Sequence, residues 1–181
     1  RLYDTAGSST EMTLRHGPAE RYLEVSSATL TDSGSVLLGV TGHLLRFEGS
    51  RLAWAAALQG GYSGPRIVPA PDGSSIAVYY ARDEEFPVVI AKFSPQGVPL
   101  WATTLGERDA AVTDVHVGPD GSVVVLGRQL RPIQERPERV SPRHGLTLFV
   151  ATYRPDGTLC WLRTANSSDW VLPVSMAVDY R

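Results

Sequence analysis

A hairpin pattern that ends in tryptophan constrains the fold of this chain more than any other feature of the sequence. Its clearest copy is Leu146 to Trp161, LTLFVATYRPDGTLCW, in which an alternating apolar strand leads through a Pro-Asp-Gly turn into a second strand. Two further copies are Val88 to Trp101 and Leu44 to Trp54, and each keeps nearly the same spacing between an aromatic residue, a turn glycine and the tryptophan. Self-similarity at a period of about 20 to 50 residues is typical of stacked or radial repeat proteins.

Each hairpin is preceded by two more short apolar runs, so the repeating unit reads as four strands. Pro-Asp-Gly at 119–121 and at 155–157 divides the last unit, because proline presets the first turn position and glycine accepts the bend that follows. Hardly any segment carries apolar residues at a helical period. We therefore expect an all-β chain of β-propeller blades, each a four-stranded antiparallel sheet. A β-sandwich is the competing fold, but it would not explain the regular tryptophan.

The expected organisation is a single, partial propeller domain over residues 1–181. A chain of 181 residues is long enough for one domain with a substantial core but not for two large ones. Three blades cannot close a ring, since propellers use about four to eight. Either the terminal segments complete a small fourth blade or the chain is part of a larger ring, and the sequence favours the larger ring. The expected blades are 22–58, 65–105 and 112–165, with terminal strands at 11–16 and 171–178.

Composition excludes several classes of protein. The net charge of −2 gives no basic footprint for nucleic acid over the whole chain. No apolar run reaches the roughly 18 residues that a membrane-spanning helix needs. The single cysteine, Cys160, excludes an internal disulfide, and its apolar neighbours predict a buried structural thiol.

No catalytic or metal-binding constellation is present in the sequence, so we predict no catalytic residue, no metal and no cofactor. The four histidines are scattered without metal-ligand spacing, and no nucleophile elbow, dinucleotide fingerprint or P-loop occurs. The repeated tryptophans are expected to pack between adjacent sheets. The turn aspartates are expected to serve turn geometry rather than calcium, because each turn supplies one carboxylate. These residues are Trp54, Trp101 and Trp161, and Asp32, Asp72, Asp120 and Asp156.

The connection between the second and third strands of each unit lengthens along the chain while the frame stays constant. Its longest copy, 128–145, is rich in proline and carries a net charge of +3. Insertions in repeat proteins collect on one face, which often binds a partner, and arginine suits carboxylate or phosphate groups. The alternative is a solvated linker. The predicted partner-binding residues are Arg128, Arg131, Arg136, Arg139 and Arg143, together with Trp170 in a second polar loop.

Over about residues 22–178, the order of apolar strand, Pro-Asp-Gly turn, apolar strand, aromatic strand, second turn and tryptophan resembles the bacterial SBBP-type β-propeller repeats. It is also similar to the repeats of PQQ-type propellers. The resemblance supports the propeller fold and says little about activity. It implies a bacterial protein that is secreted or belongs to the cell envelope.

The function that we expect is a non-enzymatic scaffold or binding module, which holds a protein or glycan partner through loops on one face, chiefly 128–145. One alternative is an enzyme domain of a quinoprotein-like or glycan-acting propeller, although the vicinal cysteine pair of quinoproteins is missing. The other alternative is an obligate assembly subunit that is completed by strand addition from further blades or another chain.

Overall fold

The computed structural model describes residues 2–3, 9–10, 24–61, 63–82, 87–105, 110–129, 146–167 and 172–179. Every regular element in these ranges is a β-strand. A short antiparallel pair, β1 (Leu2–Tyr3) and β2 (Ser9–Thr10), precedes three larger sheets. Among the described residues there is no helix long and apolar enough to cross a membrane.

Three four-stranded sheets follow one another along the chain, and we call them blades 1, 2 and 3. In each sheet the strands are antiparallel and lie side by side in sequence order. This up-and-down order is that of a propeller blade, so the predicted all-β fold of four-stranded blades is confirmed. Blade 1 consists of β3 (Val25–Leu30), β4 (Val36–Val40), β5 (His43–Glu48) and β6 (Arg51–Ala57). Blade 2 consists of β7 (Arg66–Pro69), β8 (Ser75–Tyr80), β9 (Val88–Phe93) and β10 (Pro99–Leu105). Blade 3 consists of β11 (Ala110–Val117), β12 (Val123–Gln129), β13 (Leu146–Tyr153) and β14 (Leu159–Ser167).

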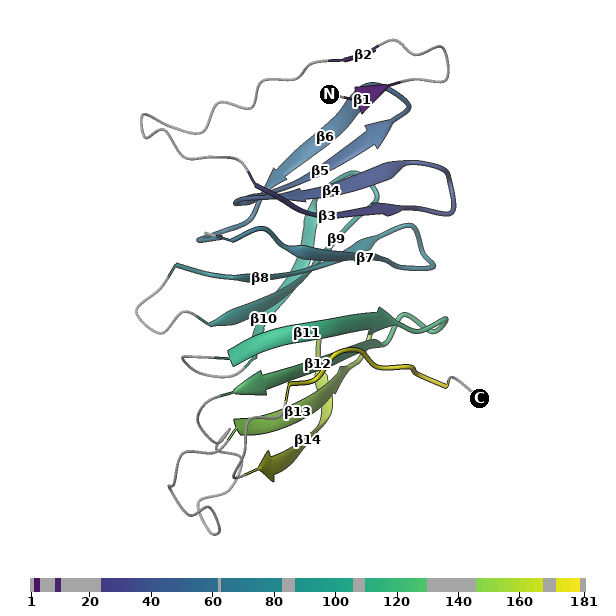
Figure 1. The fold of residues 1–181 in the computed structure, drawn as a ribbon. Coiled ribbons are helices and arrows are strands. Elements are labelled where there is room, and N and C mark those ends of the chain that lie inside the picture. Colours follow the sequence, from purple (N-terminus) through teal and green to yellow (C-terminus); the bar gives the residue numbers. More distant parts are fainter. Residues whose placement is uncertain are drawn as a thin grey trace.

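The blades are stacked face to face in chain order (Figure 1). Their first strands are neighbours, because β7 packs against β3 on one side and against β11 on the other. Over the described ranges the three sheets form an open stack rather than a closed ring.

The core lies between the sheets, and blade 2 contributes to both halves of it. Alternation along β8 sends Ile76 and Val78 toward blade 3, whereas Ala77 and Tyr79 pack with residues of blade 1. All six residues of β9 are buried. This explains why β8 and β9 read as continuous apolar runs, which is the pattern of a sheet covered on both faces.

The turns within the hairpins have the geometry that the sequence predicts. Backbone N–H groups of Ser74, Ser122 and Thr158 donate to the aspartate two residues earlier, at 2.9–3.0 Å. These bonds assign Asp72, Asp120 and Asp156 to turn structure. In the first turn Thr31 rather than Asp32 takes this role, because its hydroxyl accepts the bond from Ser35 N–H at 3.1 Å.

The expected terminal strands have different outcomes. The segment 11–16 lies outside the described residues. The strand expected at 171–178 is not formed over residues 172–178, because none of the described strands pairs with this segment. The segment instead runs beside the inner strands of blade 3, where the backbone N–H of Met176 donates to Asp114 Oδ2 at 2.9 Å (Figure 1).

Candidate interaction surfaces

The structure corrects the place of Arg128, the first of the predicted partner-binding arginines. Arg128 belongs to β12 and not to a loop, because strand pairing continues through Gln129, and it lies opposite Ala111 and Leu148. It is half-buried on a sheet face rather than displayed on a loop. The charged, proline-rich sequence begins directly after β12. The sequence pattern therefore did not show that the alternation of the strand continues through Arg128. The other predicted residues, Arg131, Arg136, Arg139, Arg143 and Trp170, lie outside the described residues.

Alternation places Arg128 on the face of blade 3 that points away from blade 2, which we call the outer face of blade 3. Val123 and Val125 belong to the core shared with blade 2, so Leu126 and Arg128 lie on the opposite side of β12. On β14, Leu162 belongs to the same shared core, and its neighbours Trp161 and Arg163 point to the outer face.

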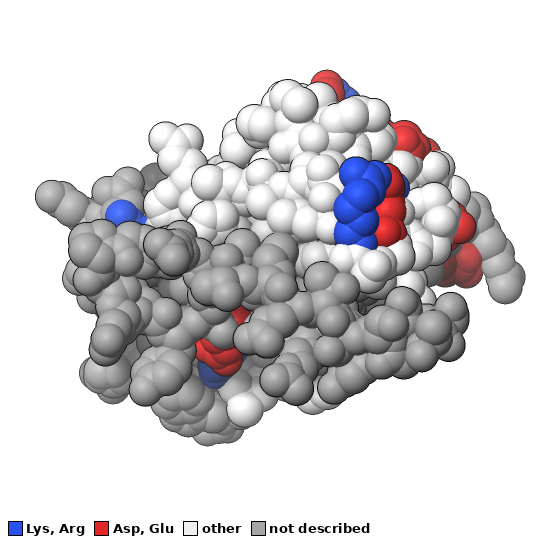
Figure 2. Space-filling view, turned by 90° about the horizontal axis from the view of Figure 1, so that it is seen from above, with Lys and Arg blue, Asp and Glu red and all other residues white. Residues whose placement is uncertain are grey.

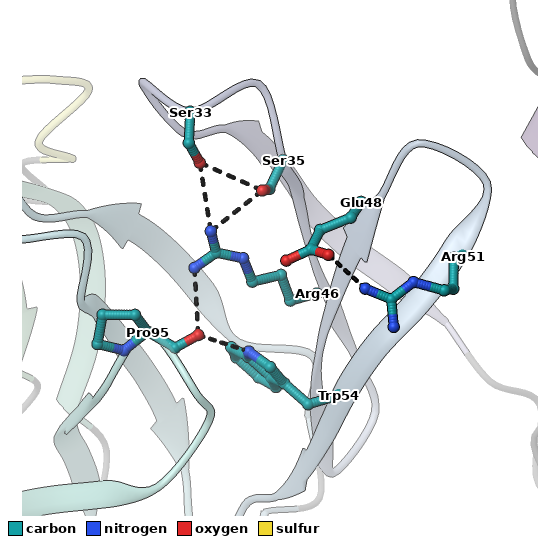
Figure 3. A network of polar contacts seen from close by, with 7 residues as sticks. All are labelled: Ser33, Ser35, Arg46, Glu48, Arg51, Trp54 and Pro95. Carbon is teal, nitrogen blue, oxygen red and sulfur yellow. Dashed lines mark hydrogen bonds and ion pairs between the residues drawn. The ribbon is translucent and has the colours of Figure 1, made fainter.

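Blades 1 and 2 are joined by a polar contact that centres on one backbone carbonyl. Trp54 in β6 donates its indole N–H to the carbonyl oxygen of Pro95 at 2.8 Å. Arg46 in β5 donates to the same oxygen from Nη1 at 3.2 Å (Figure 3). The second amino group of Arg46 bonds the hydroxyls of Ser33 and Ser35, which fixes the guanidinium against the first turn of blade 1.

The same contact joins blades 2 and 3, one repeat later. Trp101 in β10 donates its indole N–H to the carbonyl oxygen of Pro155 at 2.8 Å. In both cases the acceptor proline begins the turn between the third and fourth strands of the following blade. We call the bond from a tryptophan to the next blade's proline carbonyl the blade clip.

Each blade clip also requires a glycine two residues after the acceptor proline. A Cβ at Gly97 would lie 2.6 Å from Cδ2 of Trp54, and a Cβ at Gly157 would lie 2.7 Å from Cδ2 of Trp101. Both glycines have positive φ, 80° and 86°, which side-chain-bearing residues rarely adopt. The tryptophan therefore lies against bare backbone of the next turn, and the predicted packing of Trp54 and Trp101 between sheets is confirmed.

The three repeat tryptophans occupy the same register in their sheets. Trp54 lies opposite Arg46, Trp101 opposite Lys92, and Trp161 opposite Thr152. The pairing shifts by one residue just before each tryptophan, which is a β-bulge. At Trp54 and Trp101 the ring lies against the following blade.

Lys92, the only lysine of the chain, replaces the arginine of blade 1 but bonds within its own sheet. Its Nζ lies 2.9 Å from Oδ2 of Asp72, and its side chain is buried. Partial burial tends to raise the pKa of Asp72, but hydrogen bonds from Ser74 and the Lys92 ammonium outweigh it and lower this pKa to about 2. The charge pair thus connects the first turn of blade 2 to its third strand.

Trp161 differs from the other two tryptophans because no turn lies against its ring within the described residues. It is 41% exposed. The guanidinium of Arg163 lies 5.9 Å from the ring centroid, within the range of a cation–π contact. The hydroxyl of Thr152, opposite Trp161, is buried and has no hydrogen-bond partner in the described ranges.

Polar contacts also join neighbouring blades at their first strands. The hydroxyls of Ser26 and Ser27 donate to the carbonyl oxygen of Pro65, just before β7, at 2.8 and 2.6 Å.

Asp114 in β11 accepts the Met176 amide, as described above. Burial tends to raise the pKa of Asp114, but the Met176 and Val115 amides and His116 lower it overall.

Two features of single residues were not expected from the sequence. Cys160 is exposed, and the prediction of a buried thiol was wrong, because Cys160 is the extra residue of the bulge in β14. Gln129, at the end of β12, is fully buried, and within the described part of the chain neither its amide oxygen nor its amide nitrogen has a hydrogen-bond partner. No sequence pattern pointed to Gln129.

No metal site emerges from the residues that the structure describes. No three histidine, cysteine, aspartate or glutamate side chains in these residues are grouped to hold a metal ion. Seen from the blade 1 end of the stack, the described surface is largely uncharged, with acidic and basic side chains in small separate patches (Figure 2).

The sheets and their blade clips define a stack of propeller-type blades. No family model and no curated protein matches the chain. Among solved structures, it is similar to a protein of unknown function from Bacteroides caccae, with 15% sequence identity and a TM-score of 0.40. The match covers 84% of this chain and 64% of that protein.

Proposed function

We propose that this protein is a non-enzymatic, propeller-type binding module that holds an acidic protein or glycan through the connections between second and third strands. The observation that carries the proposal is the contrast between a constant frame and one variable connection. The three sheets repeat the same strand order and the same length of turn between their first and second strands. The connection between second and third strands instead occupies 41–42, then 81–87, then 130–145.

Antiparallel order places these connections at one end of every sheet. The turns between first and second strands and between third and fourth strands lie at the opposite end of each sheet. Variable segments on a constant scaffold are the usual place of binding residues. Four arginines of the longest connection, Arg131, Arg136, Arg139 and Arg143, supply planar donors that suit carboxylates. A secreted or cell-envelope location would be compatible with glycan binding and belongs to the same proposal.

The test replaces these four arginines together by alanine and titrates the protein with fluorescent poly-L-glutamate and with alginate oligosaccharides. We expect an affinity loss of at least tenfold for one of the two probes, with an unchanged melting temperature. A four-lysine variant keeps the charge and separates planar recognition from simple attraction. Arg154→Ala, an exposed arginine in a turn at the opposite end of blade 3, is the control. Equal binding by the alanine variant and the parent would refute the proposal.

A further inference from the structure

We infer that the outer face of blade 3 is a docking surface for a further blade, whose third-to-fourth-strand turn presents a proline carbonyl and a glycine to Trp161. The first reason is the repeated register. Trp161 stands in the same bulged position as Trp54 and Trp101, and both of those bind a Pro-x-Gly turn of the next blade. Its indole N–H makes no hydrogen bond within the described residues, and the residue is 41% exposed.

The second reason is the segment 172–179, which occupies the inner part of the same face. The Met176 amide bonds Asp114 in β11, the first strand of blade 3. In the other junctions this inner position belongs to the first strand of the following blade, as where β7 packs on β3 and β4. Val124 and Leu126, which point to the outer face, are also buried. The outer face of blade 3 is therefore covered at its inner strands, β11 and β12. It is exposed at the outermost strand, β14, where Trp161 lies.

The third reason concerns which occupant fits. A second copy stacked head to tail would present blade 1, whose corresponding turn, between Glu48 and Arg51, has no proline. An ion pair between Glu48 and Arg51 closes that turn, and no described atom lies within 4 Å of a Cβ built at Gly49. Blade 1 thus lacks the acceptor that Trp161 requires. The occupant is a blade of the type of blades 2 and 3.

The test extends the chain of residues 1–181. Residues 172–179 take the place of a first strand, so a copy of residues 70–105 joined after Arg181 adds the turn and the remaining three strands of a blade. We expect the indole N–H of Trp161 to exchange with solvent at least tenfold more slowly in the extended chain than in the parent. Changing the copied Gly97 to alanine should abolish this protection, because the added Cβ would meet the ring as it does at Trp54.

The matched control is alanine at the copied Gly73, which has a similar φ of 77° but whose Cβ would meet no tryptophan. Its protection of Trp161 should equal that of the unmodified extension. An extension that stays unfolded on the parent, or that folds without protecting Trp161, would overturn the inference. Sedimentation of the unextended chain provides a second measurement. We expect a monomer, and a dimer that Trp161→Ala dissociates would identify a second copy as the occupant and overturn the inference as well.

Discussion

Trp54 and Gly97 belong to different blades, yet a single methyl group on Gly97 would fall 2.6 Å from the tryptophan ring. This closeness makes the turn glycine of one blade part of the packing surface of the blade before it. Gly157 and Trp101 repeat the relationship at the next junction. The blade clip consequently combines a hydrogen bond, a stacked ring and a bare backbone in one contact.

Replacing Gly97 or Gly157 by alanine should destabilise the fold by about 2–4 kcal/mol, through strain at positive φ together with overpacking against the ring. Gly34→Ala is the matched control, because Gly34 has a φ of 78° and open space around its Cβ. It should cost about 1 kcal/mol. Urea denaturation measures all three, and equal losses would show that the tryptophan contact contributes nothing.

Loss of the indole donor should affect the three tryptophans unequally. Trp54→Phe and Trp101→Phe remove a bond of 2.8 Å to a proline carbonyl and should each cost about 1 kcal/mol or somewhat more. Trp161→Phe should change the stability of the unextended chain by less than about 0.5 kcal/mol, as for other surface changes. Chemical denaturation of the three variants decides the point, and a comparable loss at position 161 would contradict it.

The charge pair of blade 2 should make stability depend on pH in the acid range. The pKa of Asp72 is about 2 in the folded protein against an ordinary 3.8, so the carboxylate stabilises the fold above about pH 4. This contribution should fade as the pH falls from about 4 to 2, because the unfolded chain then binds the proton first. Lys92→Met should weaken the pH dependence in that window, as followed by melting temperature across the pH range. An identical acid profile in the variant and the parent would be inconsistent with the pair.

Gln129→Met should stabilise the protein by about 1 kcal/mol, which is unusual for a change in a core. Both amide atoms of Gln129 are buried without hydrogen-bond partners among the residues that the structure describes, and methionine has a similar length without their desolvation cost. Thermal and urea denaturation of the variant provide the measurement. A loss of stability would instead indicate that the amide is bonded in solution.

Cys160 should react fully with a thiol reagent in the folded protein, since it is exposed on the bulge of β14. Cys160→Ser should leave the free energy of unfolding unchanged within about 0.5 kcal/mol. Thiol titration without denaturant gives the first result directly. Reaction only after unfolding would mean that the thiol is buried after all.

The fold could be predicted from the sequence because its signals are local. Pro-Asp-Gly turns and alternating strands act over a few residues, and a tryptophan at a fixed distance from each turn marks the repeat. Errors arose where a residue's environment depends on a neighbour that the pattern does not specify. A strand at 171–178 requires a partner strand. The exposure of Cys160 depends on a bulge in β14. Arg128 can be assigned to a strand only when the pairing of β12 is known.

The candidate surfaces were less accessible to sequence reasoning for a related reason. The tryptophans were expected between sheets, but which atoms they meet depends on the next repeat. Nothing in the local sequence around Arg46 or Pro95 reveals that they share a carbonyl contact across blades. An alignment of the three repeats places Arg46, Lys92 and Thr152 at one position, opposite the tryptophan. The residue changes at this position from repeat to repeat, and this variation is the signal that would have drawn attention to Arg46.

The blade clips all point in one direction along the chain, from the tryptophan of one unit to the turn of the unit that follows. Each blade of the type of blade 2 thus carries a donor on one side and an acceptor on the other. Duplicating or deleting such a whole unit would leave every remaining junction with a matching donor and acceptor. The length of the array can therefore change without any new complementary surface, so that the number of blades and the connections between second and third strands are free to vary independently.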